Sequence, residues 1–150
     1  MKHVIILLLL ALSVTAFSQN RFTSKDFSIN GFRSPSIGLE YRYHQVSIHA
    51  GYYLTAFEAG ETTTFIKTGL TYWFLPFGKK PIPSSLFTGI SYLRGLSKEY
   101  EDKNALGIEV GVRIMIWKGL NLRISGITVT AKDESLKINP AGGVSYSFMF

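Results

Sequence analysis

The most constraining feature of the sequence is the strict alternation of its last ten residues, from Ala141 to Phe150. Val144, Tyr146, Phe148 and Phe150 share one parity, and glycine, serine and methionine occupy the other from position 143 onward. Because successive side chains of a strand point to opposite faces, this pattern predicts a β-strand with one apolar face and one small polar face. The same period of two recurs along most of the chain, so the sequence predicts an all-β fold.

Seven segments alternate clearly and are separated by glycine, proline or charged residues. They span residues 37–43, 46–54, 66–74, 86–92, 106–116, 120–129 and 141–150. The apolar parity changes between Ile124 and Ile127, which predicts a β-bulge at Ser125-Gly126. The long connections, 55–62, 95–104 and 131–140, alternate with shorter ones at 44–45 and 118–119 and a proline-rich one at 75–83.

Connection lengths decide the number of strands. In small membrane barrels the outer connections are long and most inner ones are tight. If the final strand runs inward, the turn at Arg33-Ser34-Pro35 must be an outer one, so the segment before it must cross from the inner side. This parity predicts a first strand over residues 25–31, and eight strands close a sheet without leaving an edge.

The N-terminus has the pattern of an export signal. Lys2 and His3 precede an uninterrupted apolar run over residues 4–12, which is too short for a transmembrane helix. The small residues Ala16 and Ser18 predict cleavage before Gln19, leaving residues 1–18 as a signal peptide and residues 19–150 as one domain; the alternative is a membrane anchor. The sequence has no cysteine, which excludes a lipoprotein anchor, disulfides and thiolate metal sites.

The polar face indicates which side of the sheet meets water. In a soluble β-sandwich, the main architectural alternative, that face would carry charged and polar side chains freely. Here it is rich in glycine and serine, as expected where side chains must approach closely inside a narrow barrel. Its few charged and ionisable residues are predicted to form a lumen network: Glu40, Arg42, His49, Lys67, Glu109, Arg113 and Arg123.

Together these features resemble the small eight-stranded outer-membrane proteins of the OmpA-like and OmpX-like kind. The resemblance implies an antiparallel up-and-down transmembrane β-barrel in the outer membrane of a Gram-negative bacterium, in contact with lipid and lipopolysaccharide. It also implies that the barrel-assembly machinery reads the final strand, with Val144, Tyr146, Phe148 and Phe150 as the assembly signal. Aromatic residues near the strand ends fit the interfacial girdles of such barrels.

No motif specifies a chemistry, so the sequence predicts no catalytic residue, no cofactor and no metal site, and no nucleic-acid partner. The leading hypothesis is a non-enzymatic protein with a structural, envelope-integrity or surface-contact role, with surface ligands reached through the charged outer loops. One alternative is a porin-like conduit for tiny solutes, motivated by a lumen excess of two positive charges. Another is a lipid hydrolase, because the two-residue turn at 44–45 places Glu40 opposite His49, with Ser47 on the same wall.

Overall fold

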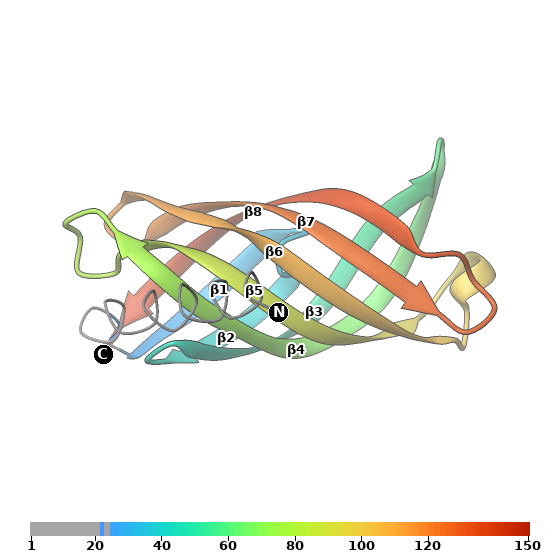
Figure 1. Cartoon of the computed structure of the whole chain (residues 1–150), viewed down its shortest axis with the longest axis horizontal. Coiled ribbons are helices and arrows are strands. Elements are labelled where there is room, and N and C mark those ends of the chain that lie inside the picture. Colours follow the sequence, from blue (N-terminus) through green and yellow to red (C-terminus); the bar gives the residue numbers. More distant parts are fainter. Residues whose placement is uncertain (1–21, 23–24) are drawn as a thin grey trace, which may run out of the picture.

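The computed structural model describes residue 22 and residues 25–150, in which eight antiparallel strands close into a single barrel (Figure 1). Each strand pairs with its neighbours in chain order, and β1 pairs with β8 to complete the ring. The elements are β1 (Lys25–Phe32), β2 (Ile37–Tyr43), β3 (Val46–Glu58), β4 (Glu61–Phe77), β5 (Ser84–Gly95), a short 3-10 helix η1 (Lys98–Tyr100), β6 (Asn104–Trp117), β7 (Leu120–Ala131) and β8 (Lys137–Met149).

The all-β class and the eight-stranded closed architecture are therefore confirmed, including the first strand that parity predicted at residues 25–31. The predicted signal peptide, residues 1–18, lies outside the described residues. The described part of the chain contains no helix of the length and apolar character needed to cross a membrane.

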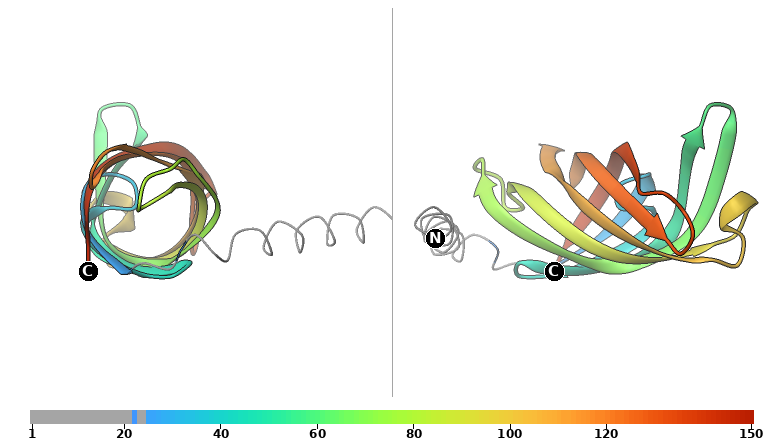
Figure 2. Two further views of the ribbon diagram at one scale, coloured as in Figure 1. Left: turned by 90° about the vertical axis from the view of Figure 1, so that its left-hand side faces the viewer. Right: turned by 45° about the vertical axis from the view of Figure 1, so that its right-hand side comes forward.

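The connections divide the barrel into two different ends. The end that carries the β2–β3, β4–β5 and β6–β7 connections and the C-terminus is called the turn end, on the left of Figure 1. The opposite end, called the loop end, carries the β3–β4 hairpin, the β5–β6 connection with η1 and the β7–β8 connection. The β3–β4 hairpin rises beyond the rest of this rim in the right-hand view of Figure 2.

Three predicted connections are shorter than expected, because the strands continue through polar or proline-containing sequence. Residues 55–58 and 61–62 belong to the hairpin of β3 and β4, and β8 begins at Lys137. Likewise, β4 continues through Pro76 to Phe77, with a register shift between Phe74 and Phe77. Backbone pairing does not need an apolar face, so the alternation of side chains underestimates strand length where a strand leaves the apolar zone.

Many apolar side chains of the strands are exposed on the outer surface, and many charged side chains are buried inside, which is the reverse of the usual distribution in a soluble protein. The outer surface is apolar: each of the eight strands exposes at least one aliphatic side chain that is 41% or more accessible, namely Ile29, Leu39, Ile48, Leu70, Ile90, Val110, Ile124 and Val144. Buried charged and hydroxyl side chains occupy much of the interior instead. Charged residues are almost never buried in soluble domains unless they are paired.

The β-bulge predicted at Ser125-Gly126 is absent: β7 pairs continuously with β6 and β8 through both residues. The apolar parity changes because the interior itself changes character, and Ile127 and Val129 point inward with unbroken alternation. The register shift of this hairpin lies instead between Met115 and Trp117. As a result Ile116 and Trp117 are both exposed, Trp117 at 63%.

One pair of glycines allows β2 and β3 to approach closely. Gly38 of β2 lies opposite Gly51 of β3 in the register. A Cβ atom on Gly38 would lie 2.2 Å from the Ala50 carbonyl oxygen and 2.6 Å from the Gly51 Cα. This is the close approach that the glycine-rich face predicted.

Candidate functional site

The candidate site is the filled interior of the barrel. All seven residues predicted for the lumen are buried there, each at most 3% exposed: Glu40 and Arg42 from β2, His49 from β3, Lys67 from β4, Glu109 and Arg113 from β6, and Arg123 from β7. They share the inward parity of their strands. The structure brings most of them together through three ion pairs.

One ion pair crosses the barrel from β7 to β2, strands that are not neighbours in the sheet. The Arg123 guanidinium donates to Glu40 Oε2. The other oxygen of Glu40 accepts the Ser47 hydroxyl at 2.5 Å, and Asn30 Nδ2 reaches Oε2 at 3.5 Å. Both carboxylate oxygens are therefore satisfied, as a buried charge requires.

A second ion pair joins β4 to β6 across the intervening β5. Lys67 Nζ donates to Glu109 Oε2 at 2.8 Å and to the Pro35 carbonyl at 2.6 Å. Glu109 Oε1 accepts the hydroxyls of Ser34 at 2.5 Å and Ser125 at 2.7 Å. The connection between β1 and β2 thus folds inward and contributes two residues to this pair.

The third ion pair involves a residue that the sequence interpretation missed. Arg42 Nε donates to Asp26 Oδ2 at 2.6 Å, and both side chains are buried. Asp26 has the same parity as the buried Ser28 and Asn30 of β1, so parity would have identified it. Within the described interior, Asp26 lowers the predicted excess of two positive charges to one.

The remaining cation, Arg113, lies against an aromatic ring rather than a carboxylate. Its guanidinium carbon is 4.1 Å from the centroid of Trp73, and that of Arg123 is 4.9 Å from the same ring. Trp73 donates its indole N–H to Ser47 Oγ at 2.9 Å and packs on Phe87. The indole face thus stabilises two buried guanidinium groups.

The predicted Glu40–His49 arrangement is present as a register pair but not as a hydrogen bond among the described residues. The two residues are directly opposed in the β2–β3 ladder. The His49 ring, however, faces the hydroxyls of Ser91 at 3.2 Å and Thr71 at 3.4 Å. Ser47 bonds Glu40 and Trp73, and the Ser47–His49 hydrogen bond that the predicted triad requires is not formed among the described residues.

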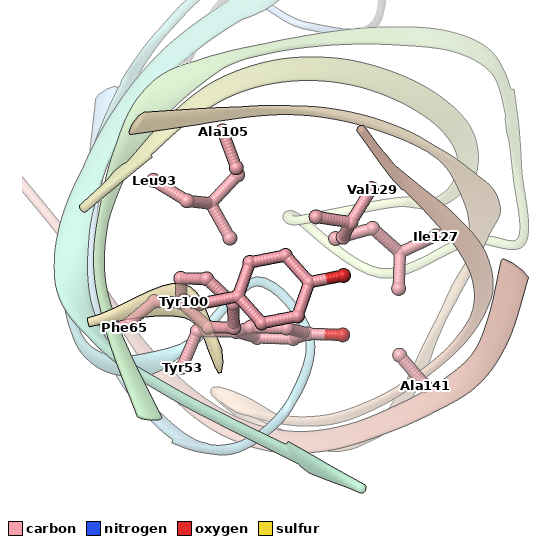
Figure 3. Close-up of a cluster of buried hydrophobic side chains, with 8 residues drawn as sticks. All are labelled: Tyr53, Phe65, Leu93, Tyr100, Ala105, Ile127, Val129 and Ala141. Carbon is pink, nitrogen blue, oxygen red and sulfur yellow. The ribbon is translucent and has the colours of Figure 1, made fainter. Parts of the chain in front are cut away.

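Towards the loop end the interior becomes apolar. A cluster of buried side chains lies inside the barrel wall in Figure 3: Tyr53, Phe65, Leu93, Tyr100, Ala105, Ile127, Val129 and Ala141. Lys67 Nζ lies 5.0 Å from the Tyr53 ring centroid, where the charged network meets this cluster. Sequence alternation alone did not distinguish the two halves of the interior.

Tyr100 closes this cluster from a connection rather than from a strand. It ends η1, and its ring lies 5.2 Å from those of Phe57 and Phe65. Two interactions attach the β5–β6 connection to neighbouring segments. The Leu96 N–H donates to the Thr64 carbonyl at 2.8 Å, and Lys103 forms an ion pair with Glu134. Burial and the nearby carboxylates of Glu134 and Glu99 raise the pKa of Tyr100 to about 12, so its phenol stays protonated.

The four residues predicted as an assembly signal lie on the outer surface at the end of the chain. Val144, Tyr146 and Phe148 of β8 are exposed, and Phe150 follows the strand. Tyr146 packs on Phe148, and Phe150 stacks on Tyr41 of β2 at 6.3 Å between ring centroids.

Among the described residues, histidine, aspartate and glutamate side chains form no group of three that could hold a metal ion. Comparisons with protein-family models, with curated proteins and with solved structures find no match.

Proposed function

We propose that this chain is an integral outer-membrane β-barrel of a Gram-negative envelope, of the OmpA-like and OmpX-like kind, with a structural or surface-contact role and no catalytic one. The single observation that carries the proposal is the inverted distribution of side chains. Every strand exposes an aliphatic residue outward, while three ion pairs and many hydroxyl groups are buried in the interior. A lipid environment is the solvent in which an apolar outer face of this extent is stable.

The proposal includes export and assembly. Residues 1–18 serve as the cleaved signal peptide, residues 19–150 form the barrel, and the barrel-assembly machinery recognises Val144, Tyr146, Phe148 and Phe150. The loop end faces outward, towards lipopolysaccharide and surface ligands. Its rim carries charges of both signs, which suits contact with a hydrated and charged surface.

The filled interior favours the structural role over a porin-like conduit. Large side chains are fully buried along the barrel, from Trp73, Arg113 and Arg123 in the charged half to Tyr53 and Tyr100 near the loop end. Small eight-stranded barrels are typically filled in this way and leave no open aqueous channel. Planar-bilayer recordings of the purified protein should therefore show no discrete channel events.

Cell fractionation combined with a heat-modifiability gel tests the proposal directly. We expect the protein in the outer-membrane fraction, with a faster-migrating folded band that shifts on boiling. Deletion of Phe150 should reduce this folded band and increase periplasmic aggregate. Recovery of the protein in the soluble periplasmic fraction, with no shift on boiling, would contradict membrane insertion.

A further inference from the structure

The acidic residues outside the interior are confined to one end of the barrel. The sequence has ten Asp and Glu residues. Three of them are buried inside, and the other seven belong to the loop end: Glu58, Glu61, Glu99, Glu101, Asp102, Asp133 and Glu134. The turn end therefore has no exposed acidic side chain in the described chain, yet it exposes Lys25, Lys79, Lys80 and Lys118.

One of these lysines, Lys118, lines a hollow in the turn-end rim. The hollow has a volume of about 330 Å³ and is lined by Pro81, Ile82, Lys118, Gly119, Ser147 and Met149. It therefore joins the β4–β5 connection, the β6–β7 turn and the end of β8. Lys80, which precedes the lining residue Pro81, joins the β4–β5 connection to the end of β6, because its ammonium group donates to the carbonyls of Met115 and Ile116.

Apolar and aromatic groups adjoin the lysines on the outer wall. Lys118 Nζ lies 4.9 Å from the ring centroid of the exposed Trp117, and Lys25 Nζ lies 5.4 Å from that of Tyr43. The register shift before Trp117 is what turns this indole outward. Ammonium groups above exposed aromatic rings are the arrangement expected where a protein meets the headgroup layer of a bilayer.

We infer that the turn-end rim is a binding site for anionic phospholipid headgroups of the inner leaflet, centred on Lys79, Lys80 and Lys118. The ammonium groups would neutralise the lipid phosphate, the hollow would hold the headgroup and glycerol, and Trp117 with Ile116 would contact the first part of the acyl chains. This inference rests on the proposed membrane location. It adds a lipid preference and assigns it to one end of the barrel.

Quenching of Trp117 fluorescence by brominated lipids tests the inference. The full chain is refolded into phosphatidylcholine bilayers that contain the same minor fraction of either brominated phosphatidylglycerol or brominated phosphatidylcholine. Trp117→Phe gives the background from the buried Trp73. We expect brominated phosphatidylglycerol to be enriched about fivefold around Trp117, which is the effect of one lysine near an anionic surface, and high salt to abolish the enrichment.

The test variant is Lys79→Gln with Lys118→Gln, which retains the carbonyl contacts of Lys80. Its matched control is Lys132→Gln with Lys137→Gln, an equal loss of charge at the loop end. The inference expects the enrichment to disappear in the test variant alone. Equal quenching by both lipids, or equal loss in both variants, would overturn it. Heat modifiability is measured on every sample, so a protein that inserts without lipid preference is distinguished from one that does not insert, which would overturn the proposed function as well.

Discussion

At the scale of single residues, two of the three buried ion pairs join strands that are not neighbours in the sheet. Glu40 and Arg123 face each other across the barrel, and each would be left as a buried charge without the other. Removing one member of a buried pair costs more than removing both, because the remaining charge has no compensation. The network therefore fixes which strands face each other across the lumen.

We expect Glu40→Gln to lower the free energy of unfolding by about 3–5 kcal/mol, measured by urea titration in lipid vesicles. The double variant Glu40→Gln with Arg123→Met should lose less than the sum of the two single variants. The exposed pair of Arg94 and Asp102 is the control, and Asp102→Asn should cost less than about 1 kcal/mol. Additive losses for Glu40 and Arg123 would mean that the two residues do not interact.

A second prediction at this scale concerns the close approach of β2 and β3 at Gly38. Gly38→Ala places a methyl group 2.2 Å from a backbone oxygen, and such overpacking costs about 1–3 kcal/mol. Gly126→Ala is the matched control, because a Cβ there meets no atom within 4 Å, and its effect should stay within about 0.5 kcal/mol. Equal unfolding midpoints for the two variants would show that Gly38 is not needed for the close approach of β2 and β3.

At the scale of elements, parity predicted the strands well and the connections poorly. The alternation and the connection lengths predicted eight strands, including β1, and the inward parity placed the seven lumen residues. Parity does not reveal which charges pair across the lumen, because that depends on barrel closure. Asp26 was missed although it has inward parity and lies directly opposite Arg42 in the β1–β2 register. Parity also could not place Tyr100, which enters the interior from a charged connection.

The β5–β6 connection supplies a prediction at this scale. In Tyr100→Ala the ring that anchors η1 is lost, so local opening should become easier by up to about 3 kcal/mol. Hydrogen exchange should accelerate at the amides of Gly95 and Asp102, which donate within this connection. Tyr100→Phe keeps the ring and removes only a buried hydroxyl without a partner among the described residues, so its exchange should match the parent protein. Unchanged exchange in Tyr100→Ala would show that the ring does not anchor the connection.

At the scale of the whole molecule, the decisive property is which solvent meets the outer wall. Val110 lies on the outer wall and is 57% accessible, and Ile138 lies near the loop end and is 69% accessible. In a bilayer the cost of arginine on the outer wall depends on depth, whereas in water both positions would be ordinary surface sites.

We therefore expect Val110→Arg to cost about 2–4 kcal/mol and Ile138→Arg about 0–1 kcal/mol when unfolding is measured in lipid vesicles. Both variants replace an exposed aliphatic side chain with arginine, so a difference between their free energies of unfolding reports the depth of each position in the bilayer. Costs within about 0.5 kcal/mol for both would be those of a water-exposed surface.

The central claim is that the apolar outer wall faces lipid, and nitroxide spin labels test it most directly. Labels are placed at positions 110 and 124 on the outer wall and at position 132 in the β7–β8 connection, in protein reconstituted into vesicles. We expect lipid-soluble oxygen to relax the labels at 110 and 124 more strongly than an aqueous nickel complex does, with the opposite order at 132. Preferential relaxation of the labels at 110 and 124 by the aqueous complex would contradict it.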